Sequence, residues 1–236
     1  MKFFIHTPPY CNTSAGIRVL YKLSNLIAQS GHESVPIVFG EEPWQQVVSD
    51  DDVVIYPEVT IGNPLRGKKI VRYLLNIPGA CGGDGKFSID DYLISFNKQH
   101  ADLTGGKYMP ILVLEEFFCD DHLAKTHDAL WVGKYRGLNP INITAIPITY
   151  SFPVNRKLLA EFLKHTDTLY TLDKLSMLNY EALACGAKVI FVDSDGSTTN
   201  ITRDDSLFYN WIEHFNQFIK DMEQWQVKDV NLIPAN

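Results

Sequence analysis

The stretch Asp173-Lys-Leu-Ser-Met-Leu-Asn-Tyr-Glu181-Ala-Leu-Ala-Cys-Gly-Ala-Lys-Val-Ile190 decides how we expect this chain to fold. It places one acid in a loop and a second inside a short helix over Ser176–Ala184, which ends at a glycine and leads into a buried strand over Lys188–Val192. Open α/β sheets bind ligands where a strand ends and the following loop opens a helix, and the free N–H groups of the helix N-terminus suit a phosphate. The alternative is an amphipathic helix whose Glu181 pairs locally.

The rest of the chain alternates short apolar runs with helical patterns, which is typical of an α/β fold. In the first half the pattern predicts strands at Lys2–His6, Val35–Phe39, Val53–Tyr56, Lys69–Leu75, Tyr92–Phe96 and Ile111–Leu114. In the second half it predicts strands at Ala129–Val132, Thr144–Ile148, Thr168–Thr171 and Lys188–Val192. Besides Ser176–Ala184, helices are expected along the apolar stripe from Ile17 to Ile27, over Arg156–Lys164, and from about Ser206 to Gln226.

The chain therefore divides into two βα-rich halves, joined by a charged and irregular segment at Glu115–Asp128. We expect an N-terminal domain over residues 1–122, a second domain over residues 123–205, and a C-terminal helical segment over residues 206–236.

Composition excludes several classes of protein. Hydrophobic residues make up 45% of the 236 residues, which is enough for a packed core. The net charge is −7 and neither half is basic, which argues against a general nucleic-acid binder. The four cysteines form no CxxC pair, so a zinc ribbon is not expected, and they suggest a reduced, cytoplasmic location. No run approaches the ~18 apolar residues of a membrane span, which leaves room only for peripheral contact with a membrane.

Three segments carry a resemblance to a known family. Asp173-x7-Glu181 and the Ala-Leu-Ala-Cys-Gly-Ala-Lys-Val-Ile that follows resemble the Glu-x7-Glu signature of retaining GT-B glycosyltransferases. The segment Ser14–Glu33 resembles the first loop and helix of that family, and Trp131–Gly137 resembles the start of its second domain. A further run, Val71–Gly79, is similar to runs in bacterial polysaccharide glycosyltransferase-like sequences, although a strand and an ordinary Pro-Gly turn would give the same pattern.

The resemblance implies two Rossmann-like domains facing a cleft, with the last helix crossing back onto the first domain. It implies a hexosyltransferase-like enzyme that moves a sugar from a nucleotide-diphosphate sugar to a glycan or lipid-linked acceptor, with retention of configuration and without a metal or other cofactor. By this resemblance Glu181 would bind the ribose hydroxyls and Asp173 would lie at the hydroxyls of the donor sugar. Lys134 and Arg136 would neutralise the diphosphate.

Three further residues belong to the expected site. By the same resemblance, Gly16 would let the first loop approach a phosphate. Ser176 stands at the helix N-terminus that would bind the donor. His100 follows the strand Tyr92–Phe96, and members of this family often place a histidine of the first domain near the donor sugar. A lone histidine at a strand end is, however, more often an ordinary satisfied polar group.

Two alternatives stay open at this point. The region between Gly137 and Asp173 is shorter than in most members of the family, which motivates a non-catalytic nucleotide-sugar or glycan-binding module with the same fold. A nicotinamide-dependent dehydrogenase or epimerase is a weaker alternative, because Pro8-Pro-Tyr-Cys-Asn12 follows the first strand where a GxGxxG loop would be needed.

Overall fold

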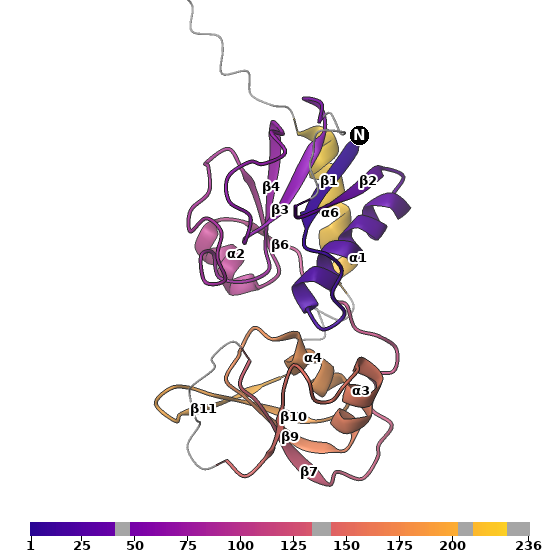
Figure 1. Cartoon of the computed structure of the whole chain (residues 1–236), viewed down its shortest axis with the longest axis vertical. Coiled ribbons are helices and arrows are strands. Elements are labelled where there is room, and N and C mark those ends of the chain that lie inside the picture. The colour runs from indigo at the N-terminus through magenta and orange to yellow at the C-terminus, as the bar shows by residue number, and fades with distance from the viewer. Residues whose placement is uncertain (41–47, 134–142, 203–209, 226–236) are drawn as a thin grey trace, which may run out of the picture. The chain divides into compact units, whose positions relative to one another are not determined.

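A computed structural model describes residues 1–40, 48–133, 143–202 and 210–225 of the chain (Figure 1). The chain divides into two compact units, of which the first comprises Met1–Leu112 with Ser206–Asn236 and the second comprises Val113–Asp205. Each unit contains its own sheet, and the two sheets are built mainly from parallel strands, as an α/β fold requires. The predicted α/β class is confirmed, and both units are compatible with Rossmann-like domains.

The first unit is built on a parallel sheet in the order β2-β1-β3-β4-β5-β6. Its strands are β1 (Lys2–Thr7), β2 (Glu33–Val38), β3 (Val53–Pro57), β4 (Lys69–Leu74), β5 (Tyr92–Ser95) and β6 (Lys107–Tyr108). Every residue of β3 is buried, which fits a parallel strand covered on both faces. The described helices of this unit are α1 (Ala15–Gln29), α2 (Lys98–Thr104) and α6 (Trp211–Gln224).

Helix α1 begins where its sequence supplies a cap. The side chain of Ser14 accepts a hydrogen bond from the backbone N–H of Ile17, which satisfies one of the free donors at the helix start. Leu20, Leu23 and Ile27 then lie on one buried stripe at helical spacing. The loop that follows β1 therefore leads directly into a helix at the carboxyl edge of the sheet.

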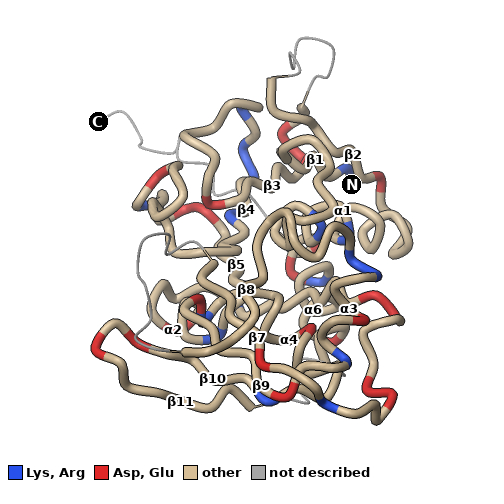
Figure 2. Tube along the Cα trace, turned by 60° about the horizontal axis from the view of Figure 1, so that its bottom comes forward, with Lys and Arg blue, Asp and Glu red and all other residues tan. Residues whose placement is uncertain are grey.

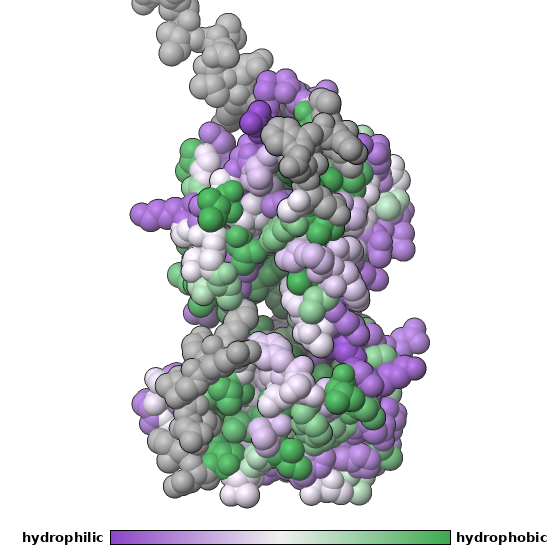
Figure 3. All heavy atoms as spheres, in the orientation of Figure 1, coloured by the Kyte–Doolittle hydropathy of each residue, from purple (hydrophilic) through white to green (hydrophobic). Residues whose placement is uncertain are grey.

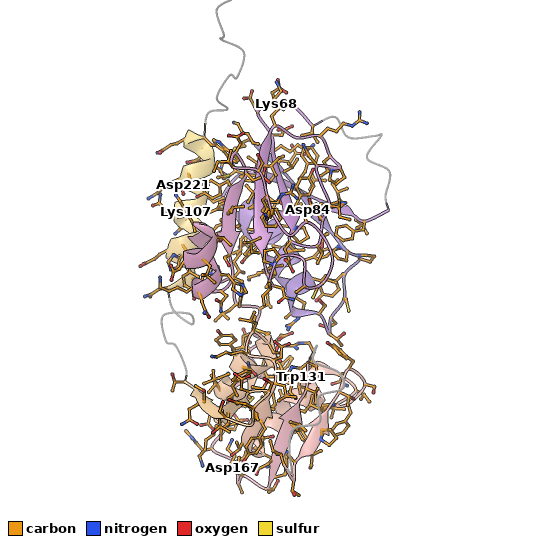
Figure 4. All side chains as sticks on the ribbon, turned by 90° about the vertical axis from the view of Figure 1, so that its left-hand side faces the viewer. Lys68, Asp84, Lys107, Trp131, Asp167 and Asp221 are labelled. Atoms are coloured by element: carbon orange, nitrogen blue, oxygen red, sulfur yellow. The ribbon has the colours of Figure 1, made fainter. Side chains whose placement is uncertain are left out.

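Helix α6 packs on the first unit, although it is the last of the described helices along the chain. The ring of Phe218 contacts Phe3 and Tyr92, at centroid distances of 6.3 and 6.1 Å. Asp221 accepts hydrogen bonds from Tyr92 and from Lys107, the latter at 2.6 Å, and Figure 4 shows Asp221 and Lys107 side by side. These contacts, and the grouping of Ser206–Asn236 with Met1–Leu112, assign α6 to the first unit, where the sequence also predicts it. The expected helix start at Ser206 lies outside the described residues.

The second unit has a five-stranded sheet in the order β11-β10-β9-β7-β8. Its strands are β7 (His127–Trp131), β8 (Ile146–Ile148), β9 (Thr166–Thr171), β10 (Lys188–Val192) and β11 (Thr198–Ile201). Among the described strands of this unit, only β11 pairs antiparallel, and it lies at one edge. The described helices are α3 (Arg156–Lys164), which Asn155 caps, and α4 (Met177–Ala184), after which Gly186 adopts a φ of +76°.

The structure differs from the prediction in a few elements. The predicted strand at Ile111–Leu114 is wrong, because this segment pairs with no strand in the described part of the chain. The short elements α2, β6 and β11 were not expected from the sequence. The second unit begins at Val113, whereas the sequence places the domain boundary at 122/123, and the expected linker Glu115–Asp128 belongs to the second unit.

The surface mixes residue types. Figure 2 shows Lys and Arg interspersed with Asp and Glu along the chain, and the face seen in Figure 3 carries hydrophobic side chains scattered among hydrophilic ones. Isolated exposed apolar residues of this kind, such as Ile89 and Leu103, are normal on a protein surface. Among the described residues, no helix has the length and apolar character needed to cross a membrane.

Candidate functional site

Each unit has one position where the order of its strands reverses. In the first unit the chain runs from β1 outward to β2 and then continues on the other side of β1 with β3. In the second unit it runs from β7 outward to β8 and then continues on the other side of β7 with β9. Ligands of open α/β sheets bind outside the carboxyl ends of the strands at such switch points. The candidate site in the second unit therefore lies where β7 and β9 end.

The loops after β7 and β9 meet at this switch point. Gly133, two residues after β7, has a φ of +63°, and a Cβ atom there would lie 2.5 Å from the Cβ of Asp173 and 2.7 Å from its Oδ2. A side chain at position 133 would therefore clash with Asp173, and the backbone conformation also favours glycine. The two motif segments Trp131–Gly137 and Asp173–Ile190 are thus brought together at Gly133 and Asp173, although 39 residues separate Gly133 from Asp173 along the chain (173 − 133 − 1).

Asp173 is held firmly in this position. It is 8% exposed, and its Oδ1 accepts a hydrogen bond from the N–H of Leu175 at 3.2 Å. Its backbone carbonyl accepts from the side-chain amide of Asn179 at 2.9 Å, while its N–H donates to the hydroxyl of Thr171 at 3.1 Å. Ser176 caps α4 by accepting from the N–H of Leu178 at 3.3 Å. Hydrogen bonds to neighbouring residues therefore fix both Asp173, the predicted loop acid, and Ser176, at the N-terminus of α4.

Glu181 lies inside α4 and is 2% exposed. Its Oε1 accepts a hydrogen bond from Nη2 of Arg156 at 2.7 Å. The same guanidinium binds Glu115 through Nε, at 2.5 Å to Oε1, and through Nη2 to Oε2. Arg156 is 7% exposed and lies 4.7 Å from the ring centroid of Phe118. One buried cation thus bridges two carboxylates, and we refer to Glu115, Arg156 and Glu181 as the arginine cluster.

Electrostatics explain why these three residues are found together. Burial of Arg156 acts to lower its pKa, but hydrogen bonds and charges of Glu115 and Glu181 outweigh burial and leave the pKa raised. The guanidinium therefore stays charged and compensates the carboxylate of Glu181, which would be costly to bury alone. Sequence reasoning missed Arg156. The sequence offered one indication of its role: an arginine lies directly after the helix cap Asn155, in the same unit as Glu181, which needs a counter-charge when it is buried.

Two of the predicted site residues lie in the first unit. Gly16 is the second residue of α1, and a Cβ atom there would make an ordinary contact of 3.6 Å with Leu75, so the available space does not require a glycine. His100 lies in α2, where its N–H donates to the cap Asn97 at 3.1 Å. Its buried Nδ1 has no partner among the described residues, and burial lowers its pKa. The structure thus describes Asp173, Ser176 and Glu181 in one unit, and Gly16 and His100 in the other.

The switch point of the first unit also carries polar side chains. His6, in β1, lies 3.2 Å from the hydroxyl of Thr60 through Nδ1, and its ring lies 4.3 Å from that of Phe39. Burial lowers its pKa from 6.5 to about 4, which keeps the ring neutral near pH 7. Glu58, just after β3, is 4% exposed and accepts from the N–H of Leu75 at 3.0 Å.

The run Val71–Gly79 begins inside β4. Arg72 of this run lies within the strand, where its Nε donates to Asp91 at 2.9 Å and its side chain is 5% exposed. Lys134 and Arg136 lie outside the described residues. No group of three His, Cys, Asp or Glu side chains in the described ranges could hold a metal ion.

Comparisons of the chain with protein-family models, with curated proteins and with solved structures gave no match.

Proposed function

We propose that this chain is a glycosyltransferase of the GT-B type, which transfers a sugar from a nucleotide-diphosphate donor to a glycan or lipid-linked acceptor. The single observation that supports this most directly is the contact between Gly133 and Asp173. It joins the two segments of the second unit that resemble the nucleotide-sugar-binding domain, and it joins them at the switch point of the sheet. The return of α6 to the first unit agrees with the same architecture.

Each predicted site residue of the second unit would have a chemical role. Asp173 would hold hydroxyls of the donor sugar, and the N-terminus of α4 beyond Ser176 would face its phosphates. Glu181 would accept hydrogen bonds from the ribose diol. Lys134 and Arg136 would compensate the charge of the departing diphosphate, so that no metal is needed.

Nucleotide binding is the direct test of this proposal. The purified chain is screened by thermal shift with UDP, GDP, dTDP and CMP compounds, because a ligand that binds only the folded state raises the apparent stability. Isothermal titration calorimetry then compares the best ligand in the wild type and in Glu181→Gln, a substitution that keeps the shape of the side chain. We expect Glu181→Gln to weaken binding about tenfold or more. Unchanged affinity would remove Glu181 from the site.

A second candidate function is a nucleotide-sugar or glycan-binding module without catalytic activity. The short region between Gly137 and Asp173 favours this candidate, because it makes the second unit smaller than the nucleotide-sugar domain of most members of the family that the sequence resembles. The two candidates differ in turnover. Donor hydrolysis and transfer to glycan acceptors, followed with the nucleotide-sugar that binds, would show product only for the enzyme. Binding without turnover would favour the module.

A further inference from the structure

The arginine cluster contains a residue that no part of the expected site accounts for. Arg156 is the first residue of α3 and follows the cap Asn155, so its backbone is fixed at the helix start. Its guanidinium forms a fork with Glu115 and uses the same Nη2 to reach Glu181. The ring of Phe118 covers the guanidinium at 4.7 Å. These contacts leave Arg156 little freedom, so the oxygen that it binds on Glu181 is fixed as well.

We propose that Arg156 is a positioning residue, which holds Glu181 oriented to accept hydrogen bonds from the two hydroxyls of a ribose. This inference rests on the proposed function, because it takes Glu181 as the residue that meets the ribose. A carboxylate has about four lone-pair sites, so the bond from Arg156 is compatible with acceptance from ligand hydroxyls. Charge-assisted bonds to a fixed carboxylate are stronger than bonds between neutral groups, provided that the carboxylate stays charged where it is buried.

The geometry explains why the cation at position 156 should be arginine. A planar guanidinium offers several N–H donors in a rigid fork, so it can hold Glu115 with two bonds and still reach Glu181. The ammonium of a lysine is a compact charge that cannot keep this fork, although it would supply the same positive charge. Arg156→Lys should therefore preserve the charge of the cluster and lose part of the orientation of Glu181.

The test compares nucleotides that differ only in the ribose hydroxyls. Calorimetry measures the dissociation constants of UDP and GDP and of their 2′,3′-dideoxy analogues, and the readout is the ratio of the dideoxy constant to the ribo constant. We expect the wild type to prefer the ribonucleotide about tenfold or more, and Glu181→Gln to reduce this ratio to near one. Arg156→Gln should reduce the ratio equally, and Arg156→Lys should give an intermediate value. Lys188→Met, which removes the exposed pair with Asp167, should leave the ratio unchanged.

A purely structural role would give a different pattern. If Arg156 only stabilised the fold, its substitution would weaken the ribo and dideoxy ligands to the same extent, and the ratio would stay at the wild-type value. A wild-type ratio in Arg156→Gln, together with a ratio near one in Glu181→Gln, would overturn the inference and leave the proposed function standing. If wild type and Glu181→Gln had the same ratio, the assignment of Glu181 itself would fail. Should Arg156→Gln not fold, Arg156→Lys decides by the same readout.

Discussion

Replacing Gly133 by alanine tests the contact on which the candidate site depends. Two costs apply at this position. An L-residue in the left-handed region costs roughly 1–2 kcal/mol, and the φ of Gly133 is +63°. The new Cβ would also lie 2.5 Å from the Cβ of Asp173, an atom close to the backbone of a residue that is 8% exposed. Overpacking a fixed neighbour adds about 1–3 kcal/mol. We therefore expect Gly133→Ala to lower the free energy of unfolding of the second unit by roughly 2–5 kcal/mol.

Gly186 supplies a matched control in the same unit. Its φ is +76°, so alanine there meets a similar conformational cost. Its new Cβ would approach the carboxylate end of Asp120, but this side chain is 38% exposed and can move away. Gly133→Ala should thus be the more destabilising by about 1–3 kcal/mol. Differential scanning calorimetry measures both variants, and hydrogen exchange of the β9 amides assigns the transition to the second unit. Equal destabilisation would refute a rigid contact at Asp173.

Three further predictions concern the first unit. The pKa of His6 is about 4 in the folded state and 6.5 as its ordinary value, so only the unfolded state binds a proton between these pH values. The free energy of unfolding should therefore fall as the pH drops from 6.5 toward 4, and His6→Gln should flatten this slope in urea titrations. Burial acts to raise the pKa of Asp221, but the hydrogen bond from Lys107 and the other bonds to Asp221 outweigh burial and lower it. Its contribution to stability is present above the unfolded pKa of ~3.9 and is lost as the pH falls through the folded pKa. Asp221→Asn should consequently reduce the melting temperature at pH 6, and this reduction should become smaller as the pH falls below the unfolded pKa. The hydroxyl of Tyr73 donates to the carbonyl of Met109 at 2.6 Å in the core. Tyr73→Phe should cost about 1–3 kcal/mol in chemical denaturation, because it leaves a buried carbonyl without this donor.

The segment around α4 could be predicted because its determinants are local. The helix was expected over Ser176–Ala184, and the structure has Met177–Ala184 with Ser176 as the cap. A capping serine, a short apolar run and a glycine with positive φ act within a few residues of one another, so the sequence alone specifies them. The following strand, Lys188–Val192, was predicted with its observed bounds for the same reason.

Elements that depend on distant partners could not be predicted in this way. The run Ile111–Leu114 is as apolar as a buried strand, but a strand also needs a neighbouring ladder. The last ladder bond before it joins the N–H of Met109 to the carbonyl of Ser95, and the N–H of Ile111 points at the hydroxyl of Tyr73 at 3.5 Å. Whether Ile111–Leu114 forms a strand therefore depends on tertiary contacts, which the local sequence pattern does not contain.

The same distinction applies to Glu181, for which the sequence left two alternatives, a local pair or a ligand contact. Its partner in the structure is Arg156, which lies 25 residues away along the chain and on a different helix. A carboxylate that is 2% exposed requires a counter-charge whether or not it also meets a ligand. The two alternatives are therefore not exclusive, because the ion pair that makes burial of Glu181 affordable also fixes the direction in which its oxygens point. A loss of stability on substitution of Glu181 cannot distinguish a structural carboxylate from a ligand-binding one. The two are distinguished by whether the substitution changes the preference for nucleotides that carry the ribose hydroxyls.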